Sequence, residues 1–354
     1  MSNSKSYSAP KRRHKRRLPV WAGVIIVMLL FLLLLLAAAL ITINMTLNKI
    51  SRPDLTAENE FYTEEELAEL DLAEAVAAGN AAGLGSDEVE TVYPELSPDS
   101  ITWTSPSEEV AAAETVYNIL LIGQDARDGE TRARSDSMIL VTINKTTKTI
   151  TMTSFLRDLY VQIPGYNDNR INAAYAFGGM SLLDQTIYEN FGVEIDANIE
   201  VRFEAFEEII DILGGVDIDL TSAEANYLGL SAGVNHLNGE NALSYARIRY
   251  IDSDVYRSAR QRNVMSVVYS NFKNASTSQI MALINEILPL LTTDLTNTEI
   301  LALAIDLVPI LSGSTLNSQC VPADGTYTFN TINSMAVIVA DMDANRQFLK
   351  DTLE

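Results

Sequence analysis

The sequence has very few of the side chains on which thiolate metal sites and nucleophilic triads are built. Its 354 residues include one cysteine, Cys320, and two histidines, His14 and His236. A single cysteine excludes an intrachain disulfide and a metal site made of thiolates. A Ser-His-Asp or Cys-His mechanism would depend on His236 alone, because His14 stands in a basic N-terminal tail. We therefore expect chemistry that needs neither histidine nor cysteine.

Charge of either sign is missing from residues 18–48, and residues 20–41 are almost continuously apolar. Those 22 residues would form a helix of about 33 Å, enough to cross a hydrocarbon core of about 30 Å. Because residues 1–17 carry seven Lys or Arg and no acid, we expect a cytoplasmic tail there, a transmembrane helix over 18–43 and an outside location for the rest. A cleaved signal peptide is the alternative, with a candidate cleavage site at 37–39, but the apolar run continues past that site.

Positive charge is absent between Pro53 and Ala126, whereas residues 54–114 carry seventeen Asp and Glu. Self-repelling charge and few apolar residues indicate a largely disordered acidic stalk over residues 44–114, within which Thr63 and Glu66 match a helix capping box. We expect this stalk to hold the globular part away from the membrane.

The part outside the membrane would be strongly acidic. The chain has 25 Lys and Arg against 47 Asp and Glu, and without the seven basic tail residues its net charge falls from −22 to −29. Such a surface repels nucleic acid except where positive charge is concentrated. From Thr115 onward there are twelve Arg and four Lys. Guanidinium groups grip phosphate oxygens with two parallel hydrogen bonds, so this bias favours a phosphate ligand over plain surface charge.

Strand and helix patterns alternate after Thr115. They predict strands over 116–123, 137–144, 148–155, 198–203 and 215–220, with a hairpin turn at 144–146. They predict helices over 181–192, 203–215, 238–247, 256–272, 278–291 and 297–311, then a short β region and a last helix from Met342. This alternation predicts one α/β domain over residues 115–354, with a mixed central sheet and helices on both faces in α-β-α layers. Its motif-bearing core spans 117–268 and a C-terminal extension spans 273–354.

An acid-plus-arginine cluster, GQDARDGETRARSD, leaves the first predicted strand at its carboxyl end, where open α/β sheets place ligands. Asp125 and Asp136 frame a loop that also holds Arg127, Arg132 and Arg134. Two carboxylates at the mouth of a strand suit Mg²⁺, which completes its shell with water and phosphate oxygens. A solvated loop with local ion pairs is the alternative.

Two further clusters follow. Arg157 and Asp158 end the strand over 148–155, where a single such pair is commonly structural. The stretch RIRYIDSDVYRSARQR, residues 247–262, holds five arginines and no lysine. An extended backbone would put its first two arginines on one face, and a helix would align Arg257 with Gln261. An arginine-rich solvated helix face is the competing interpretation.

With these residues assembled, the chain resembles the LytR–CpsA–Psr family of cell-envelope proteins. The similarity runs from about Tyr117 to Val268 and includes NILLIGQDARDG, RSDSMILVTINKTTKTITMTSFLRDLYVQIPG, RINAAYAFGG, GGVDIDL, LNGENALSYARIRYIDSD and YRSARQR. Two positions depart from the family's usual pattern, Leu156 in place of proline and Gln124 in place of threonine. Neither departure removes a charged group.

The resemblance implies a phosphotransferase that moves a glycopolymer, such as teichoic acid or capsule polysaccharide, from an undecaprenyl-pyrophosphate carrier to the 6-hydroxyl of an N-acetylmuramic acid in peptidoglycan. It implies that Asp125 and Asp136 hold Mg²⁺ or Mn²⁺. Asp254 becomes a candidate for orienting an arginine or accepting the hydroxyl proton, with Arg134 and Arg249 acting on the reacting phosphate. The pyrophosphate clamp it implies comprises Arg127, Arg134, Arg157, Arg247, Arg249, Arg257 and Gln261. We expect Arg260 and Arg262 to face water.

Fixed positive charge and positioning supply most of the catalysis in phosphoryl transfer, which agrees with the scarcity of histidine and cysteine. The expected partners are the lipid-linked polymer, peptidoglycan and the cell membrane, and not nucleic acid. An apolar slot for the lipid tail is also expected; the helices after Ser278 could line it, although core packing is the competing interpretation. Two functional alternatives stay open, a polyprenyl-pyrophosphate hydrolase and a non-enzymatic lipid-binding envelope regulator.

Overall fold

A computed structural model describes residues 42–53, 61–70, 93–124, 134–248, 251, 254–274, 283, 285–311 and 313–354. The chain divides into two units, residues 1–48 and 49–354, and the architecture is that of the second unit. Over these described ranges, no helix is long and apolar enough to cross a membrane. The predicted transmembrane helix over 18–43 lies almost entirely outside them.

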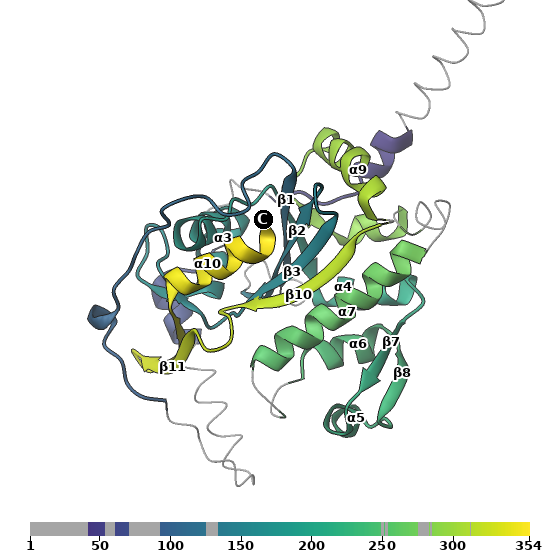
Figure 1. Ribbon diagram of the computed structural model, residues 1–354. Coiled ribbons are helices and arrows are strands. Elements are labelled where there is room, and N and C mark those ends of the chain that lie inside the picture. The colour runs from purple at the N-terminus through teal and green to yellow at the C-terminus, as the bar shows by residue number, and fades with distance from the viewer. Residues whose placement is uncertain are drawn as a thin grey trace, which may run out of the picture. The chain divides into compact units, whose positions relative to one another are not determined.

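A mixed six-stranded sheet forms the centre of the second unit, in the order β10-β3-β2-β1-β6-β9 (Figure 1). Three consecutive strands make an antiparallel meander: β1 (Val116–Gln124), β2 (Ser135–Asn144) and β3 (Thr149–Phe155). On one side of this meander, β6 (Ala197–Arg202) runs parallel to β1, and on the other side β10 (Thr315–Val321) runs parallel to β3. The short β9 (Thr292–Thr293) pairs antiparallel with β6 and forms the edge of the sheet. The predicted turn is confirmed, because Asn144 Oδ1 accepts the N–H groups of Thr146 and Thr147 at 3.0 and 3.1 Å.

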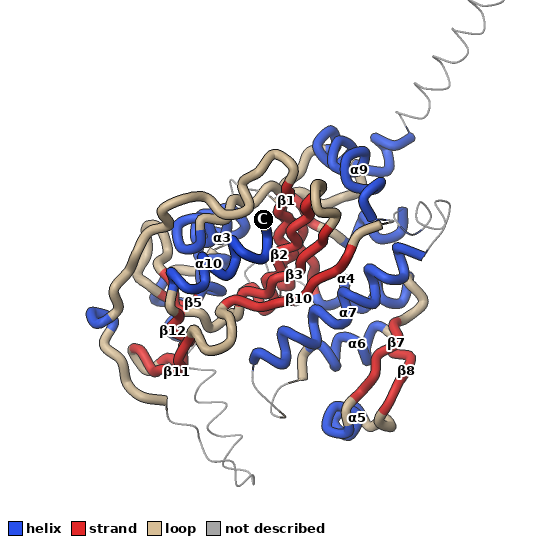
Figure 2. The backbone as a smooth tube through the Cα atoms, viewed as in Figure 1, coloured by secondary structure: helices blue, strands red, loops and turns tan. Residues whose placement is uncertain are grey.

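Helices cover both faces of this sheet (Figures 1 and 2). On one face lie α3 (Ile171–Phe191) and α10 (Met342–Leu353). On the other lie α4 (Phe203–Ile212), α6 (Gly239–Ala246) and α7 (Asp254–Asn274). The main hydrophobic core fills the space on the α3 side and includes the fully buried Leu120, Phe155 and Phe191. The mixed sheet with its covered faces confirms the predicted α-β-α layers.

Smaller elements surround these layers (Figure 2). An antiparallel ribbon of β7 (Val216–Leu220) and β8 (Gly233–Leu237) carries α5 (Ser222–Leu228) between its strands. His236 lies on this ribbon, paired with Asp217 rather than with a nucleophile. Further described elements are η1 (Pro98–Ser100), β4 (Tyr160–Val161), β5 (Asn169–Arg170), η2 (Leu288–Leu290), α9 (Asn297–Leu311), β11 (Tyr327–Ile332) and β12 (Met335–Ala340).

Helix α3 begins ten residues before the predicted helix over 181–192. Its first turns are rich in small residues, and Ala173, Ala174 and Ala176 are buried in the main core, so packing rather than amphipathic periodicity holds this part helical. The helix kinks at Gly178-Gly179, where Gly179 has a φ of 62° and a Cβ would lie 3.0 Å from the Phe61 ring. It ends at Gly192 as predicted, in the left-handed conformation.

Parts of the predicted stalk pack onto the domain. Leu67 and Val110 are 2% and 3% exposed and belong to the main core. The capping box is confirmed, because Thr63 N–H donates to Glu66 Oε2 and Glu66 N–H donates to Thr63 Oγ1. The ordered domain therefore begins before Thr115, earlier than the sequence predicts, since scattered apolar side chains in an acidic segment find places in the core.

Candidate functional site

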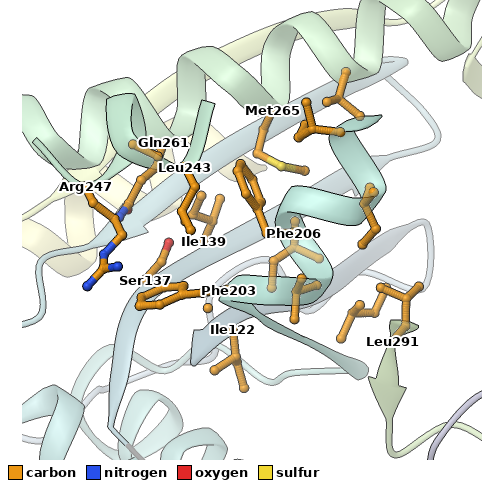
Figure 3. A pocket seen from close by; sticks show the side chains of 18 of the residues that line it. Ile122, Ser137, Ile139, Phe203, Phe206, Leu243, Arg247, Gln261, Met265 and Leu291 are labelled. Atoms are coloured by element: carbon orange, nitrogen blue, oxygen red, sulfur yellow. The ribbon is translucent and has the colours of Figure 1, made fainter. Parts of the chain in front are cut away.

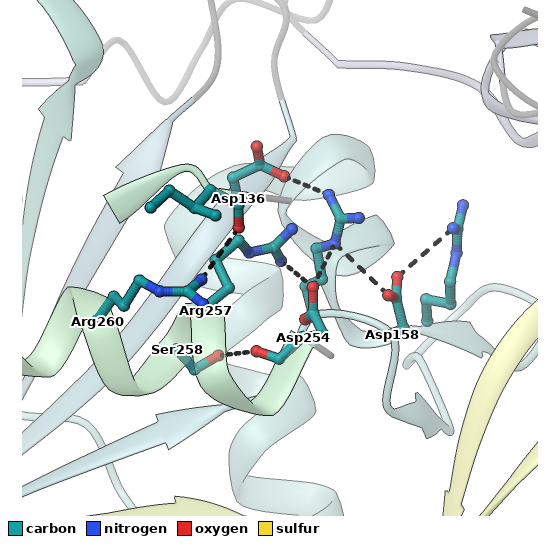
Figure 4. Close-up of polar contacts among 9 residues, drawn as sticks. Asp136, Asp158, Asp254, Arg257, Ser258 and Arg260 are labelled. Atoms are coloured by element: carbon teal, nitrogen blue, oxygen red, sulfur yellow. Dashed lines mark hydrogen bonds and ion pairs between the residues drawn. The ribbon is translucent and has the colours of Figure 1, made fainter. Parts of the chain in front are cut away.

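The start of β2 and the end of β3 bring a carboxylate and an arginine together. Asp136 is the second residue of β2, and Arg157 follows the end of β3. Because the two strands are antiparallel, with Met138 opposite Phe155, these residues meet although 21 positions separate them. Arg157 Nη1 donates to Asp136 Oδ1 at 2.8 Å (Figure 4).

Helix α7 adds a second carboxylate–arginine pair. Asp254 is its first residue, and Arg257 Nη2 lies 2.6 Å from Asp254 Oδ1. Arg157 Nε is 3.8 Å from the same oxygen and 3.5 Å from Asp158 Oδ2, while Asp158 Oδ1 is 3.6 Å from Arg170 Nη1. Positive and negative groups therefore alternate along one continuous network (Figure 4). We call it the arginine–carboxylate cluster: Asp136, Arg157, Asp158, Arg170, Asp254 and Arg257.

The surroundings of this cluster shift the ionisation of its members. Burial lowers the pKa of Arg157, but the nearby Asp158, Asp136 and Asp254 raise it more, so the pKa lies above its ordinary value. Burial raises the pKa of Asp254, and Arg257 opposes this shift only in part. Among the described residues, Asp254 Oδ2 is buried and has no hydrogen-bond partner. The cluster thus combines a permanent cation with a carboxylate that can accept a proton.

An apolar cavity of about 240 Å³ lies between the sheet and helices α4, α6 and α7 (Figure 3). Arg247, at the C-terminus of α6, and Gln261, on α7, are at one end of it. The guanidinium carbon of Arg247 is 4.3 Å from the centroid of the Phe203 ring, which orients this exposed cation across an aromatic face. The walls are almost entirely apolar and include Ile139, Ile199, Val201, Phe206, Leu243 and Met265.

The structure brings together many of the predicted site residues. Asp136, Arg157, Asp254 and Arg257 share one network, and Arg247 and Gln261 lie at the cavity. Arg134 immediately precedes β2. Asp125, Arg127, Arg132 and Arg249 lie outside the described residues.

The prediction that Arg260 and Arg262 face water is wrong. They are 3% and 7% exposed, because α7 packs against the sheet on one side and against the β7–β8 ribbon on another. Arg260 Nε donates to Glu224 Oε1 at 2.8 Å and its Nη1 donates to the Ile248 carbonyl at 3.2 Å. Arg262 Nε donates to Ser318 Oγ on β10 at 2.8 Å. Both arginines therefore fasten α7 to its neighbours.

Sequence reasoning missed two features of this region. Arg170, which pairs with Asp158, stands at the start of the RINAAYAFGG motif, and its place just before a helix was the available signal. The second feature is a buried network in which Gln124 Nε2 donates to the Tyr175 hydroxyl at 3.0 Å and that hydroxyl donates to Glu200. Burial raises the pKa of both Tyr175 and Glu200. No sequence pattern connects these three residues, which come from β1, α3 and β6.

The described carboxylates offer a small donor set for Mg²⁺. Across the part of the chain that the structure describes, no group of three or more His, Cys, Asp and Glu residues is placed to hold a metal. Mg²⁺ commonly uses only one or two carboxylates and fills its shell with water and phosphate oxygens, so a smaller donor set suffices. Asp136, near the start of β2, would supply one carboxylate to such a shell, with its Oδ1 also accepting from Arg157 at 2.8 Å.

Comparison with known proteins places the chain in a family. The model of the LytR_cpsA_psr family matches residues 91–351. The polyisoprenyl-teichoic acid–peptidoglycan teichoic acid transferase TagT of Bacillus subtilis is 38% identical over 173 residues, which cover 45% of this chain and 54% of TagT. The chain thus spans about half the length of the curated relatives it matches.

Solved structures show the same fold. The structure of TagT bound to LIIa-WTA has a TM-score of 0.57 and 28% identity, covering 71% of this chain and 97% of that chain. The LytR-CPS2A-psr family protein YwtF (TagT) with bound octaprenyl pyrophosphate lipid has a TM-score of 0.54 and 25% identity, covering 72% and 97%. The family model covers well over half of the chain, so this protein belongs to the LytR_cpsA_psr family, as its motifs predict.

Proposed function

We propose that this protein is a membrane-anchored phosphotransferase. It would move a glycopolymer, such as teichoic acid or a capsule-like polysaccharide, from an undecaprenyl-pyrophosphate carrier to the 6-hydroxyl of N-acetylmuramic acid in peptidoglycan. Residues 18–43 would anchor it in the cell membrane, with the basic tail in the cytoplasm and the domain outside.

One observation carries this proposal. Arg257, in the arginine–carboxylate cluster, and Gln261, at the apolar cavity, are four residues apart on α7 and so lie on the same face of that helix. A cluster that offers guanidinium groups and an apolar cavity are thus presented side by side. This is the arrangement that an amphipathic ligand with a pyrophosphate head and a hydrocarbon tail requires. The octaprenyl pyrophosphate bound to a relative supports the same assignment.

The cavity residues would place the carrier with its head at Arg247 and Gln261. Arg157 and Arg257, joined by Arg127, Arg134 and Arg249, would hold the phosphate oxygens on which negative charge increases in the transition state. Asp125 and Asp136 would hold Mg²⁺, which when bound neutralises part of the pyrophosphate charge.

The transfer itself is a displacement at the phosphorus that carries the glycopolymer. The acceptor hydroxyl oxygen forms a new bond to this phosphorus, the bond from phosphorus to the bridging oxygen breaks, and the lipid leaves as polyprenyl phosphate. The hydroxyl proton passes to a carboxylate, for which the buried Oδ2 of Asp254 is the candidate. Arg257, 2.6 Å from Asp254 Oδ1, would hold this carboxylate in place.

The test uses the full-length protein in liposomes with a polyprenyl-pyrophosphate-linked glycan and peptidoglycan oligomers. We expect glycan transfer with release of polyprenyl phosphate, and a loss of about 100-fold or more in Asp136→Ala. The exposed Asp306→Ala is the matched control and should keep full activity. Unchanged transfer in Asp136→Ala would contradict the proposal. Equal lipid release without peptidoglycan would instead indicate a hydrolase, and binding without turnover a regulator.

A further inference from the structure

The apolar cavity has two unlike ends. Arg247 and Gln261 lie at one, and Leu291 lies at the other (Figure 3). Ile287, four residues before Leu291, also lines the wall and adds a second aliphatic side chain from the same segment. A ligand with a charged head at Arg247 would therefore direct its hydrocarbon tail toward Leu291.

The Leu291 end is bonded to a segment from near the N-terminus of the chain. Ser51 N–H donates to the Leu291 carbonyl at 3.1 Å, and Thr293 N–H donates to the Ser51 carbonyl at 3.2 Å. Ser51 thereby pairs in parallel with Thr292 at the edge of the central sheet. Ile50 is 8% exposed, and Arg52 Nη2 donates to Asn297 Oδ1 at the start of α9 at 2.9 Å. We call residues 50–52 the edge segment.

The edge segment stands very close in sequence to the proposed transmembrane helix. Only seven residue steps separate Ile43, the end of that helix, from Ile50. Fully extended, this stretch spans about 25 Å, a bound that follows from chain length alone. The acidic residues 54–92 come after the edge segment, so they cannot set the distance between the membrane and the β9 edge. A stalk over residues 54–92 would therefore set the distance from the membrane only for parts of the domain that follow it in the chain.

We propose that the β9 and α9 edge is the surface that faces the lipid bilayer, and that the polyprenyl tail enters the cavity from the bilayer past Leu291 and Ile287. The inference rests on the proposed function for the anchor and for the lipid-linked substrate. Helix α9 presents Ile305 at 66% exposure, and an aliphatic side chain of that kind suits contact with the lipid interface. The edge segment joins the tail end of the cavity to the short stretch of chain that follows the proposed transmembrane helix.

This arrangement fits the chemistry of the carrier. A polyprenyl chain is confined to the bilayer by its apolar area, so a cavity whose tail end faces away from the bilayer would require complete extraction of the lipid into water. A tail end at the bilayer surface needs only partial withdrawal, while the pyrophosphate reaches Arg247 at the far end of the cavity.

The test uses fluorescence quenching and no turnover, so its result is independent of whether transfer occurs. Cys320 is the only native cysteine, and Cys320→Ser gives a background for single labels. A nitrobenzoxadiazole label at Ile305→Cys is compared with one at Val234→Cys, which is 73% exposed on β8, in full-length protein in liposomes containing doxyl-labelled lipid. We expect about threefold stronger quenching at position 305 than at 234. Equal quenching, or stronger quenching at 234, would overturn the proposal.

A pair of variants tests the edge segment itself. Ser51→Pro removes the N–H that donates to Leu291, whereas Ser51→Ala keeps it. We expect the quenching at position 305 to fall toward that at 234 in Ser51→Pro and to stay unchanged in Ser51→Ala. Full quenching in the proline variant would show that the edge segment does not fix this orientation.

Discussion

Arg260 and Glu224 form a buried ion pair, with Nε 2.8 Å from Oε1 and side chains 4% and 10% exposed. The pair joins α7 to α5, whereas Arg257, one turn earlier on α7, joins Asp254 in the arginine–carboxylate cluster. Arginines that look equivalent in the sequence therefore have two roles: some pair with neighbouring elements and stabilise the packing of α7, and others lie where they can bind a ligand.

Arg260→Ala should destabilise the fold. It would leave the Glu224 carboxylate buried without its cation, and breaking a buried pair in this way costs roughly 3–5 kcal/mol. Urea unfolding of the purified protein measures the change. The exposed Arg202→Ala is the control and should stay within about 0.5 kcal/mol of the parent. A cost below about 1 kcal/mol for Arg260→Ala would rule out a structural role for the pair.

Turnover should depend on the ionisation of Asp254. Burial raises the pKa of this carboxyl above its ordinary value, and a base must be deprotonated, so kcat/KM should fall as pH falls through the raised pKa. Asp254→Asn should remove this inflection and lower turnover by about 100-fold. Asp158→Asn alters the same cluster without removing the base, so this variant should have a lower kcat/KM but the same inflection in its pH profile. An unchanged pH profile in Asp254→Asn would exclude it as the base.

Filling the cavity should weaken binding of long lipid tails. Val201 lines the wall on β6, and Val201→Phe would occupy space that the tail needs. We expect KM for a long-chain polyprenyl substrate to rise about tenfold, which corresponds to about 1.4 kcal/mol. A short-chain soluble analogue should be turned over as before, and Val201→Ala should leave both substrates little changed. Equal effects on the two substrates would argue against the cavity as the tail site.

The free energy of unfolding should depend on pH through the titration of the Asp184 carboxyl. Asn198 Nδ2 donates to Asp184 Oδ2 at 2.7 Å and to Asp294 Oδ2 at 2.8 Å, and burial raises the pKa of Asp184 to about 7. Since the unfolded pKa is about 4, the folded state holds an extra proton between these values, and stability falls as pH rises from about 4 to 7.

Asp184→Asn should flatten that slope by up to about 1.4 kcal/mol per pH unit, because it removes one titrating proton. Urea unfolding from pH 4 to 8 measures the slope. The exposed Asp306→Asn should leave it unchanged. A slope identical to that of the parent in Asp184→Asn would mean that this carboxyl does not titrate in the folded state.

Local patterns predicted the parts of the fold that local sequence controls. Alternating apolar residues located β1, β2 and β3, and Asn144 and Gly192 marked a turn and a helix end correctly. Pairings between distant segments were beyond reach. Nothing in Thr315–Val321 indicates that it adds to the sheet beside β3, and the first half of α3 is helical because its alanines pack in the core.

In the candidate site, too, the sequence predicted which residue types take part but not how distant segments pack against them. Residue types and motifs selected Asp136, Arg157, Asp254 and Arg257, which the structure joins in one network. They did not separate these from Arg260 and Arg262, because burial of a helix face depends on what packs against it. The cavity was also hidden, since its walls come from three strands, three helices and the segment at Ile287 and Leu291.

The most direct test of the central claim is the rate of glycan transfer from a polyprenyl-pyrophosphate carrier to peptidoglycan by Arg157→Ala and Arg157→Lys. Arg157 contacts three carboxylates of the cluster and is the cation around which the site is built. We predict a loss of about 100-fold or more in both variants with the fold retained by circular dichroism, because lysine lacks the forked donors that grip phosphate. Transfer at the parent rate in either folded variant would contradict the account.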